Sequence, residues 1–158
     1  MSASVVLSQA FTLPGGATLR NRLLKSAMSE ALARRDGKPT PELTRLYGAW
    51  ADGGIGLCVT GNVMIDKRAI GEPGNVIIED ESHLPELQAW AQAATRHGAH
   101  CWVQLNHPGK QAPKGLNKET VSPSAVPFRS DMQAFFATPR ELTDAEVRNL
   151  IARFGVAA

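Results

Sequence analysis

A short apolar segment, Cys101 to Leu105, changes abruptly into Asn106-His107-Pro108-Gly109, and it constrains the fold more than any other stretch. An apolar run of this length that ends at a Pro-Gly turn is typical of a buried strand, and such strands belong mostly to parallel sheets. Gln104 lies inside the run, where its amide must find hydrogen-bond partners or cost about 1–3 kcal/mol. The partners are either protein groups or a ligand, and the run by itself leaves both open.

Two further apolar runs alternate with two amphipathic segments. Leu23 to Met28 and Ile55 to Thr60 are predicted to form buried strands. A helix is predicted from Thr40, which can cap it, to the Gly53-Gly54 pair, because apolar residues recur there at helical spacing. A second helix is predicted from about His83 to Gly98, where a basic last turn is followed by glycine.

The remaining segments flank this alternation. Residues 11–19 carry a hairpin signal around Pro14-Gly15-Gly16. Residues 111–140 read as a long irregular segment, and loops of that length tend to be lids or binding loops. Thr143 and Glu146 form a capping box that predicts an amphipathic helix reaching Ala158 or ending just before it.

Strands that alternate with helices predict an α/β fold with right-handed crossovers and a parallel sheet. Two architectures fit: a doubly wound open sheet, or part of an eightfold βα barrel. No Gly-rich phosphate-binding motif follows any predicted strand, which argues against the nucleotide-binding open sheets. In a barrel, the residues that follow each strand share one rim, so residues 27–29, 61–62 and 104–107 would converge there.

Composition narrows the class of protein. The chain has 158 residues, 43% hydrophobic and 20% charged, with a net charge of +2, which predicts one globular domain. Without a basic stripe or an apolar run long enough to span a bilayer, we expect no nucleic-acid partner, no membrane and a cytoplasmic location. Cys58 and Cys101 lie in strand-like runs and suit buried reduced thiols, and the four histidines lack metal-ligand spacing, so no metal is expected.

Several motifs occur in an order that resembles one enzyme family. The motifs are Leu19-Arg20-Asn21-Arg22, Lys25-Ser26-Ala27-Met28-Ser29, Asp36-Gly37, Tyr47, Gly56-Leu57-Cys58-Val59-Thr60-Gly61, Gln104 to Lys110, and Pro139-Arg140-Glu141-Leu142-Thr143. Together they resemble the N-terminal part of the old yellow enzyme family, the FMN-dependent ene-reductases and NADH:flavin oxidoreductases. The resemblance extends from about Phe11 onward and favours the barrel.

The resemblance implies cofactor roles for five residues. Ala27 and Met28 would lie along the flavin ring, Ser29 near its N5/O4 edge, Asn62 would offer its backbone to O4, and Gln104 would bind the pyrimidine edge. Amide groups that match this edge hold the ring and stabilise charge on the reduced flavin. Ser29 stands where relatives carry Thr or Cys, so its hydrogen-bonding role can survive while thiol-based tuning cannot. Ala27 stands where many relatives carry Pro, which loosens the backbone there.

The resemblance also implies a reaction and a fold class. NAD(P)H would reduce FMN, and flavin N5 would pass a hydride to an activated alkene. The substrate-binding pair and the proton donor would lie beyond the C-terminus, so no catalytic residue is assigned within this chain. The fold class is α/β, a partial (β/α)8 TIM barrel with an N-terminal hairpin and about three βα units, in which residues 1–158 form the N-terminal portion of a single FMN-binding barrel.

A partial barrel would leave strand edges and one sheet face unpaired. Because each buried unpaired backbone group costs about 1–3 kcal/mol, we expect a complementary barrel chain or a second copy as partner, and no activity without it. A different class of function stays open, a non-catalytic partial-barrel assembly fragment that binds no flavin by itself. A third alternative is another βα-barrel enzyme whose rim only resembles these motifs.

Overall fold

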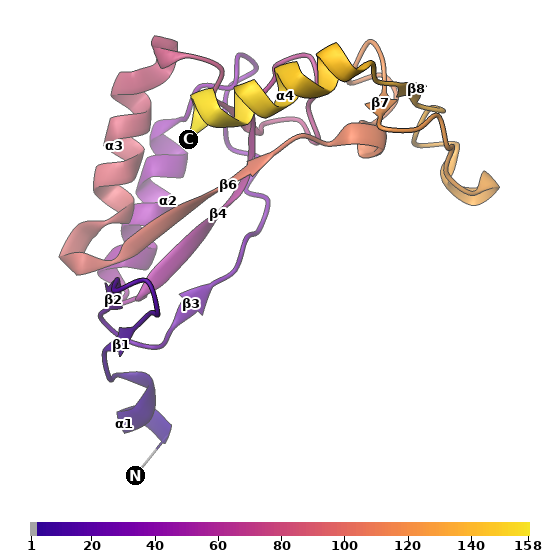
Figure 1. Cartoon of the computed structure of the whole chain (residues 1–158). Coiled ribbons are helices and arrows are strands. Elements are labelled where there is room, and N and C mark those ends of the chain that lie inside the picture. The colour runs from indigo at the N-terminus through magenta and orange to yellow at the C-terminus, as the bar shows by residue number, and fades with distance from the viewer. Residues whose placement is uncertain (1–2) are drawn as a thin grey trace.

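A parallel sheet with two helices on one face forms the centre of the molecule (Figure 1). The computed structural model describes residues 3–158. The sheet contains β3 (Leu24–Lys25), β4 (Leu57–Met64), β5 (Val76–Ile77) and β6 (His100–Asn106). The longer helices are α2 (Pro41–Asp52), α3 (Leu84–Ala94) and α4 (Asp144–Ala157). Outside the sheet lie α1 (Ala3–Leu7), β1 (Phe11–Thr12), β2 (Thr18–Leu19), β7 (Val121–Ser122) and β8 (Arg140–Glu141).

The strand order supports the predicted crossovers. β4 lies in the middle and pairs in parallel with β6 along one edge. Along its other edge it pairs with β3 in its first half and with β5 in its second half, again in parallel. β3, β4 and β6 are each separated in sequence by one of the two predicted helices. The predicted α/β alternation is therefore confirmed, while β5 is a strand that the sequence did not predict.

The core lies between the sheet and the two helices α2 and α3. Leu43 and Tyr47 of α2, Cys58 and Val63 of β4, and Trp90 of α3 are buried there against one another. Tyr47 makes an edge-on ring contact with Trp90, with centroids 5.1 Å apart. Thr40 caps α2 by accepting a hydrogen bond from the Leu43 amide, as predicted.

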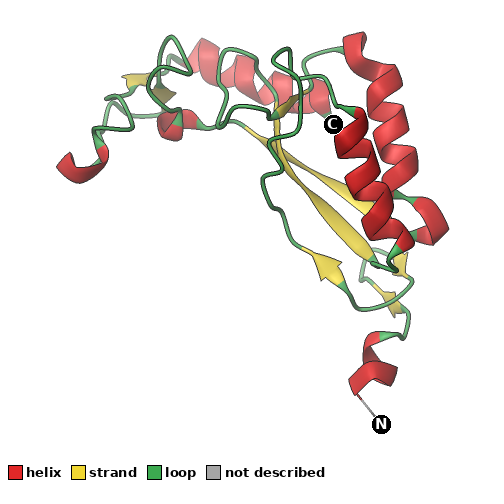
Figure 2. Cartoon of the chain, turned by 180° about the vertical axis from the view of Figure 1, so that it is seen from behind, coloured by secondary structure: helices red, strands yellow, loops and turns green. Residues whose placement is uncertain are grey.

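The opposite face of the sheet is open. In both views α2 and α3 lie on one side of β4 and β6, and no helix covers the other side (Figure 2). Side chains alternate along β6, so Cys101 and Leu105 pack against the core while Trp102 and Gln104 point to the open face.

The prediction of strands buried on both faces is therefore wrong for two of them. Trp102 and Val103 are 45% and 48% exposed, and Leu24 of β3 is 54% exposed. The physical reason is that, among residues 3–158, no helix lies over the open face and no strand pairs with the outer edge of β6. The first predicted strand is also shorter than expected, since only Leu24 and Lys25 of residues 23–28 join the ladder.

β4 continues four residues past the predicted end at Thr60. The register shifts within the β4–β6 ladder, where Val59 pairs with Trp102 and the next paired position is Asn62 with Gln104. Two residues of β4 therefore oppose one residue of β6, which is a β-bulge. The Thr60 hydroxyl accepts the Gln104 amide proton at 2.9 Å and so replaces a backbone bond at the bulge.

The flanking segments largely follow the prediction. β1 and β2 pair antiparallel as the expected hairpin, and the long segment after β6 holds little more than the short parallel pair β7–β8. Thr143 and Glu146 form both bonds of the capping box at the start of α4. α4 lies across the C-terminal ends of β4 and β6 (Figure 1). No helix within residues 3–158 has the length and apolar content that crossing a membrane requires.

Candidate functional site

A pair of amide side chains marks the C-terminal ends of two adjacent strands. Gln104 Nε2 donates to Asn62 Oδ1 at 2.5 Å, and both side chains are half-buried. The bulge in β4 makes this contact possible, because it brings Asn62 into register with Gln104. Gln104 therefore finds a polar partner on the neighbouring strand, and its amide oxygen remains available to a ligand on the open face.

The third predicted segment lies directly beside this pair. A Cβ placed on Gly61 would be only 2.6 Å from the Met28 carbonyl oxygen, so the backbone after β3 packs against the bulge of β4. Met28 exposes 54% of its surface, and Ala27 is half-buried. The Ser29 hydroxyl donates to the carboxylate of Glu72.

Of the residues expected to converge at one rim, Met28, Gly61, Asn62 and Gln104 thus lie together. The cofactor roles of Ala27, Met28, Ser29, Asn62 and Gln104 stay a prediction. Thr60 and Glu72, which contact two of these residues, were not predicted to be part of the site. Thr60 could have been found as a hydroxyl residue at the end of an otherwise apolar run. Glu72 could not, because it is far from Ser29 in the sequence and no local pattern links the two.

A buried charged cluster underlies the segment 27–29. The Tyr47 hydroxyl donates to Glu30 Oε1 at 2.6 Å, and Lys25 Nζ lies 3.8 Å from the same oxygen. The Glu30 and Lys25 side chains are only 9% and 15% exposed. Burial, together with the hydrogen bond to the Glu30 carboxylate, raises the pKa of Tyr47 far above its ordinary value, so the phenol stays protonated.

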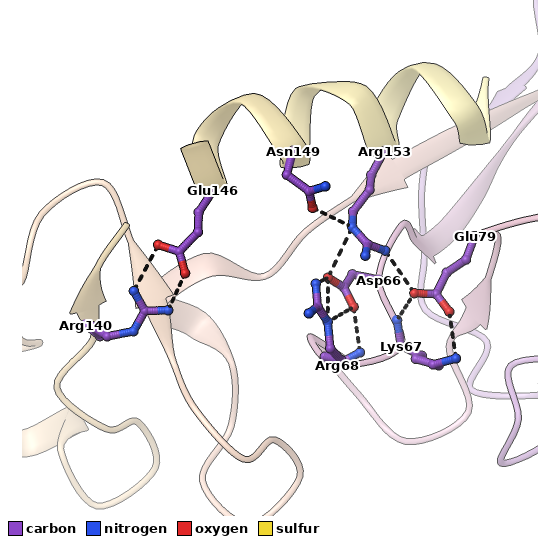
Figure 3. A network of polar contacts seen from close by, with 8 residues as sticks. All are labelled: Asp66, Lys67, Arg68, Glu79, Arg140, Glu146, Asn149 and Arg153. Carbon is purple, nitrogen blue, oxygen red and sulfur yellow. Dashed lines mark hydrogen bonds and ion pairs between the residues drawn. The ribbon is translucent and has the colours of Figure 1, made fainter. Parts of the chain in front are cut away.

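A second network fixes α4 over the strand ends (Figure 3). Asp66, whose side chain is 4% exposed, accepts from the Arg68 guanidinium at 2.7 Å and lies 3.7 Å from Arg153 of α4. Arg153 also donates to Glu79 at 3.1 Å. Burial alone would raise the pKa of Asp66, but the hydrogen bonds from Arg68 and the charge of Arg153 hold it below its ordinary value.

His107 belongs to the turn after β6. Its Nδ1 accepts the Gly109 amide proton at 3.1 Å, and burial lowers its pKa, so the ring is neutral near pH 7. A cavity of about 290 Å³ lies between His107, Asp66 and the first turns of α4. The His107 ring therefore stabilises the turn after β6, a turn that the Pro-Gly sequence indicates.

The two cysteines are free and lie opposite each other on β4 and β6. Burial raises the pKa of both thiols, that of Cys101 to about 11. Since the thiolate is the reactive form, neither side chain is suited to nucleophilic chemistry at neutral pH.

The residues at the open rim fit a planar ring with a polar edge. Met28 and Trp102 are both exposed, and the alternation along β6 places Trp102 on the open face. The amides of Asn62 and Gln104 supply both donors and acceptors beside that surface. An isoalloxazine ring combines an apolar face with a hydrogen-bonding pyrimidine edge, so the donor set and the surface are compatible with a flavin.

The chain is similar to known proteins in sequence along nearly its whole length. A sequence model described as the NADH:flavin oxidoreductase / NADH oxidase family matches residues 11–158. The NADH-dependent flavin oxidoreductase iccE of Talaromyces variabilis is 35% identical over 99% of this chain and 42% of its own length. The NADH-dependent flavin oxidoreductase iliE of Hypocrea jecorina is 32% identical, with 99% and 43% covered.

The fold is also found among solved structures. The old yellow enzyme homologue from Zymomonas mobilis superposes with a TM-score of 0.83 at 23% identity, covering 96% of this chain and 44% of that chain. The predicted fold class, a partial βα barrel, is thereby confirmed. The chain spans about two fifths of the length of the curated relatives that it matches. On the match across residues 11–158, the chain belongs to the NADH:flavin oxidoreductase / NADH oxidase family.

Proposed function

We propose that this chain is the cofactor-edge portion of a cytoplasmic, FMN-dependent NAD(P)H oxidoreductase that reduces activated C=C bonds. The name of the family includes both flavin and NADH, which supports an oxidoreductase that uses these two cofactors. The alkene substrate rests on the resemblance to ene-reductases. Two free thiols in the core suit a reducing compartment such as the cytoplasm.

The observation that carries the proposal is the Gln104–Asn62 pair. Two amides that meet on the uncovered face of a parallel sheet, at the carboxyl ends of its strands, occupy the place where α/β proteins bind ligands. A purely structural pair would be expected inside the core, where its partners would be protein groups on all sides. This pair is half-buried and borders exposed apolar side chains.

Each residue would contribute a separate interaction. Gln104 and Asn62 would bind the polar edge of the ring, and Met28 with Ala27 would pack along it. Ser29, whose hydroxyl proton is directed to Glu72, would present lone pairs to a donor on the ring. When bound, FMN would supply the hydride-transfer chemistry, since no side chain of these five is a redox group.

FMN binding by the purified chain tests the proposal. We expect Gln104→Leu to weaken FMN binding roughly 30-fold, because two amide hydrogen bonds of about 1 kcal/mol each are lost. Gln88→Leu on the exposed side of α3 is the matched control and should bind as the wild type does. Fluorescence titration of FMN, which is quenched on binding, measures both.

The alternative class predicts a different result. A non-catalytic assembly fragment would take up no flavin, with or without a partner chain, and would keep its fold in Gln104→Leu. Equal affinity for FMN in Gln104→Leu and Gln88→Leu would contradict the proposed site even if the wild type binds.

We further propose that the open face and the free edge of β6 are covered in the functional protein by complementary βα units or a second copy of this chain. The exposed side chains that support this are Trp102 and Val103 on the two faces of β6, and Ile151 and Phe154 on α4. An edge strand with large apolar residues on both faces pairs readily with another strand.

Native mass spectrometry of the chain, with and without FMN, tests this association. We expect a dimer or a complex with the complementary units, and more of it when FMN is present, because a ligand that binds only the assembled state stabilises that state. A monomer that stays folded at all concentrations, with FMN bound one to one, would contradict the association.

A further inference from the structure

The segment that would face the cofactor is not held by its own backbone. Residues 27–31 follow β3, and in the described chain they form no backbone hydrogen bond with a neighbouring strand or loop. The next contacts along the chain are Leu32, whose carbonyl accepts from the Thr40 hydroxyl at 2.7 Å, and Ala33, whose amide donates to Gly74 at 2.9 Å. Unpaired backbone groups at residues 27–29 are available to a ligand, but something else must then fix the segment.

Besides the bond between the Ser29 hydroxyl and Glu72, the contacts of Glu30 can do so. Its side chain turns away from the open face into the protein, where Oε1 accepts from the Tyr47 hydroxyl at 2.6 Å. Its other oxygen lies so near Gly61 that a Cβ there would be 2.4 Å from it. One carboxylate therefore contacts both α2 and the bulge of β4.

The charge of Glu30 is balanced within the same cluster. Lys25 Nζ lies 3.8 Å from Glu30 Oε1, donates to the Ser26 carbonyl at 2.9 Å and sits 4.7 Å from the Trp50 ring centroid. A buried carboxylate with one cation and one phenol as partners is held in a single orientation, since any other would leave the charges unpaired. That orientation fixes the position of the backbone at Met28, two residues earlier.

We propose that Glu30, held by Tyr47 and Lys25, is a positioning residue that fixes Met28 and Ser29 level with the amides of Asn62 and Gln104. The inference rests on the proposed flavin function, which it deepens by naming a residue that acts on the ring through its neighbours. Tyr47, whose hydroxyl is committed to Glu30, acts in the same way from α2. Neither residue would touch the ring itself.

Backbone hydrogen exchange provides the first test, on the full chain without FMN. In the described chain residues 27–31 have no backbone hydrogen bond, so the protected amide nearest to Glu30 is that of Ala33, which donates to Gly74. In Glu30→Ala we expect the Ala33 amide to exchange roughly tenfold or more faster, because the segment before it loses its anchoring hydrogen bond. Tyr47→Phe removes only the hydroxyl and should accelerate exchange of the same amide less. Glu30→Gln keeps an acceptor for Tyr47 but loses the charge that Lys25 balances, so its exchange should fall between that of Glu30→Ala and that of the wild type. Glu42→Gln, in an exposed pair with Arg45 on α2, is the control.

FMN affinity and the visible absorption band of bound flavin provide the second test. For Glu30→Ala we expect FMN affinity to fall about tenfold and the band to change shape, with both partly recovered in Glu30→Gln, which keeps the acceptor for Tyr47. Exchange of the Ala33 amide in Glu30→Ala as slow as in Glu42→Gln would overturn the inference, and so would equal acceleration in β4 and β6. If the wild type binds no FMN, the proposed function fails by itself, and the exchange result still decides whether Glu30 fixes the segment.

Discussion

Gly61→Ala is expected to destabilise the fold by about 2–3 kcal/mol and to abolish measurable FMN binding. The added methyl would lie 2.4 Å from Glu30 Oε2 and 2.6 Å from the Met28 carbonyl oxygen, and the second of these is backbone that cannot rotate away. The cavity that borders Gly61, Asn62 and Glu30 measures about 10 Å³, so there is no space into which a methyl group could move.

The clash acts on the site because of where it lies. Gly61 is in the bulge of β4, one residue before Asn62, and it faces the segment that carries Met28. Relief requires either the strand or the segment to shift, and either shift separates the groups that would bind the ring. Strain of this kind therefore lowers stability and affinity together.

Urea unfolding and FMN titration measure the two effects of Gly61→Ala. Gly155→Ala in α4 is the matched control, because a Cβ there meets nothing within 4 Å and alanine favours the helix. Gly155→Ala should be neutral or slightly stabilising. If the Gly61→Ala protein were as stable as the Gly155→Ala protein, the close approach of Glu30 and Met28 to Gly61 would not limit the size of the residue at position 61.

Asp66→Asn is expected to loosen the docking of α4, at a cost of about 2 kcal/mol in the free energy of unfolding. Asp66 is the buried carboxylate that joins Arg68 to Arg153, and the neutral amide would leave two guanidinium groups without their shared anion. The matched control is Asp131→Asn, since the Asp131 pair with Arg129 is equally short at 2.6 Å but exposed, and it should change stability little.

Lowering the pH should reduce the free energy of unfolding for the same reason as Asp66→Asn, because it neutralises the Asp66 carboxylate. The folded pKa of Asp66 lies below its ordinary value of 3.8, so the stabilisation is fully present above that pH and is lost as the pH falls through the folded pKa. Unfolding measured between neutral pH and about pH 3 should show a loss in the wild type that is smaller in Asp66→Asn. An identical pH dependence in both proteins would rule out Asp66 as the group that titrates.

Local patterns were sufficient to predict the elements that depend on short-range forces. Thr40 before Pro41, the capping box of Thr143 and Glu146, and the turn at Pro14-Gly15-Gly16 each act within a few residues, so their outcome could be predicted without a fold. Alternating apolar runs likewise predicted which strands and helices share a core.

The sequence by itself thus determined the three longer helices, the parallel direction of the predicted strands and the identity of Gln104 as a polar residue that needs a partner. Only the tertiary structure decided that this partner is Asn62. The two amides meet at a bulge in β4, and the register there depends on the pairing of residues more than forty positions apart. The same holds for Glu30, since the burial of its charge depends on Tyr47 from α2 and Gly61 from β4 meeting beneath one loop. Contacts between distant segments follow from packing as a whole, which no local pattern encodes.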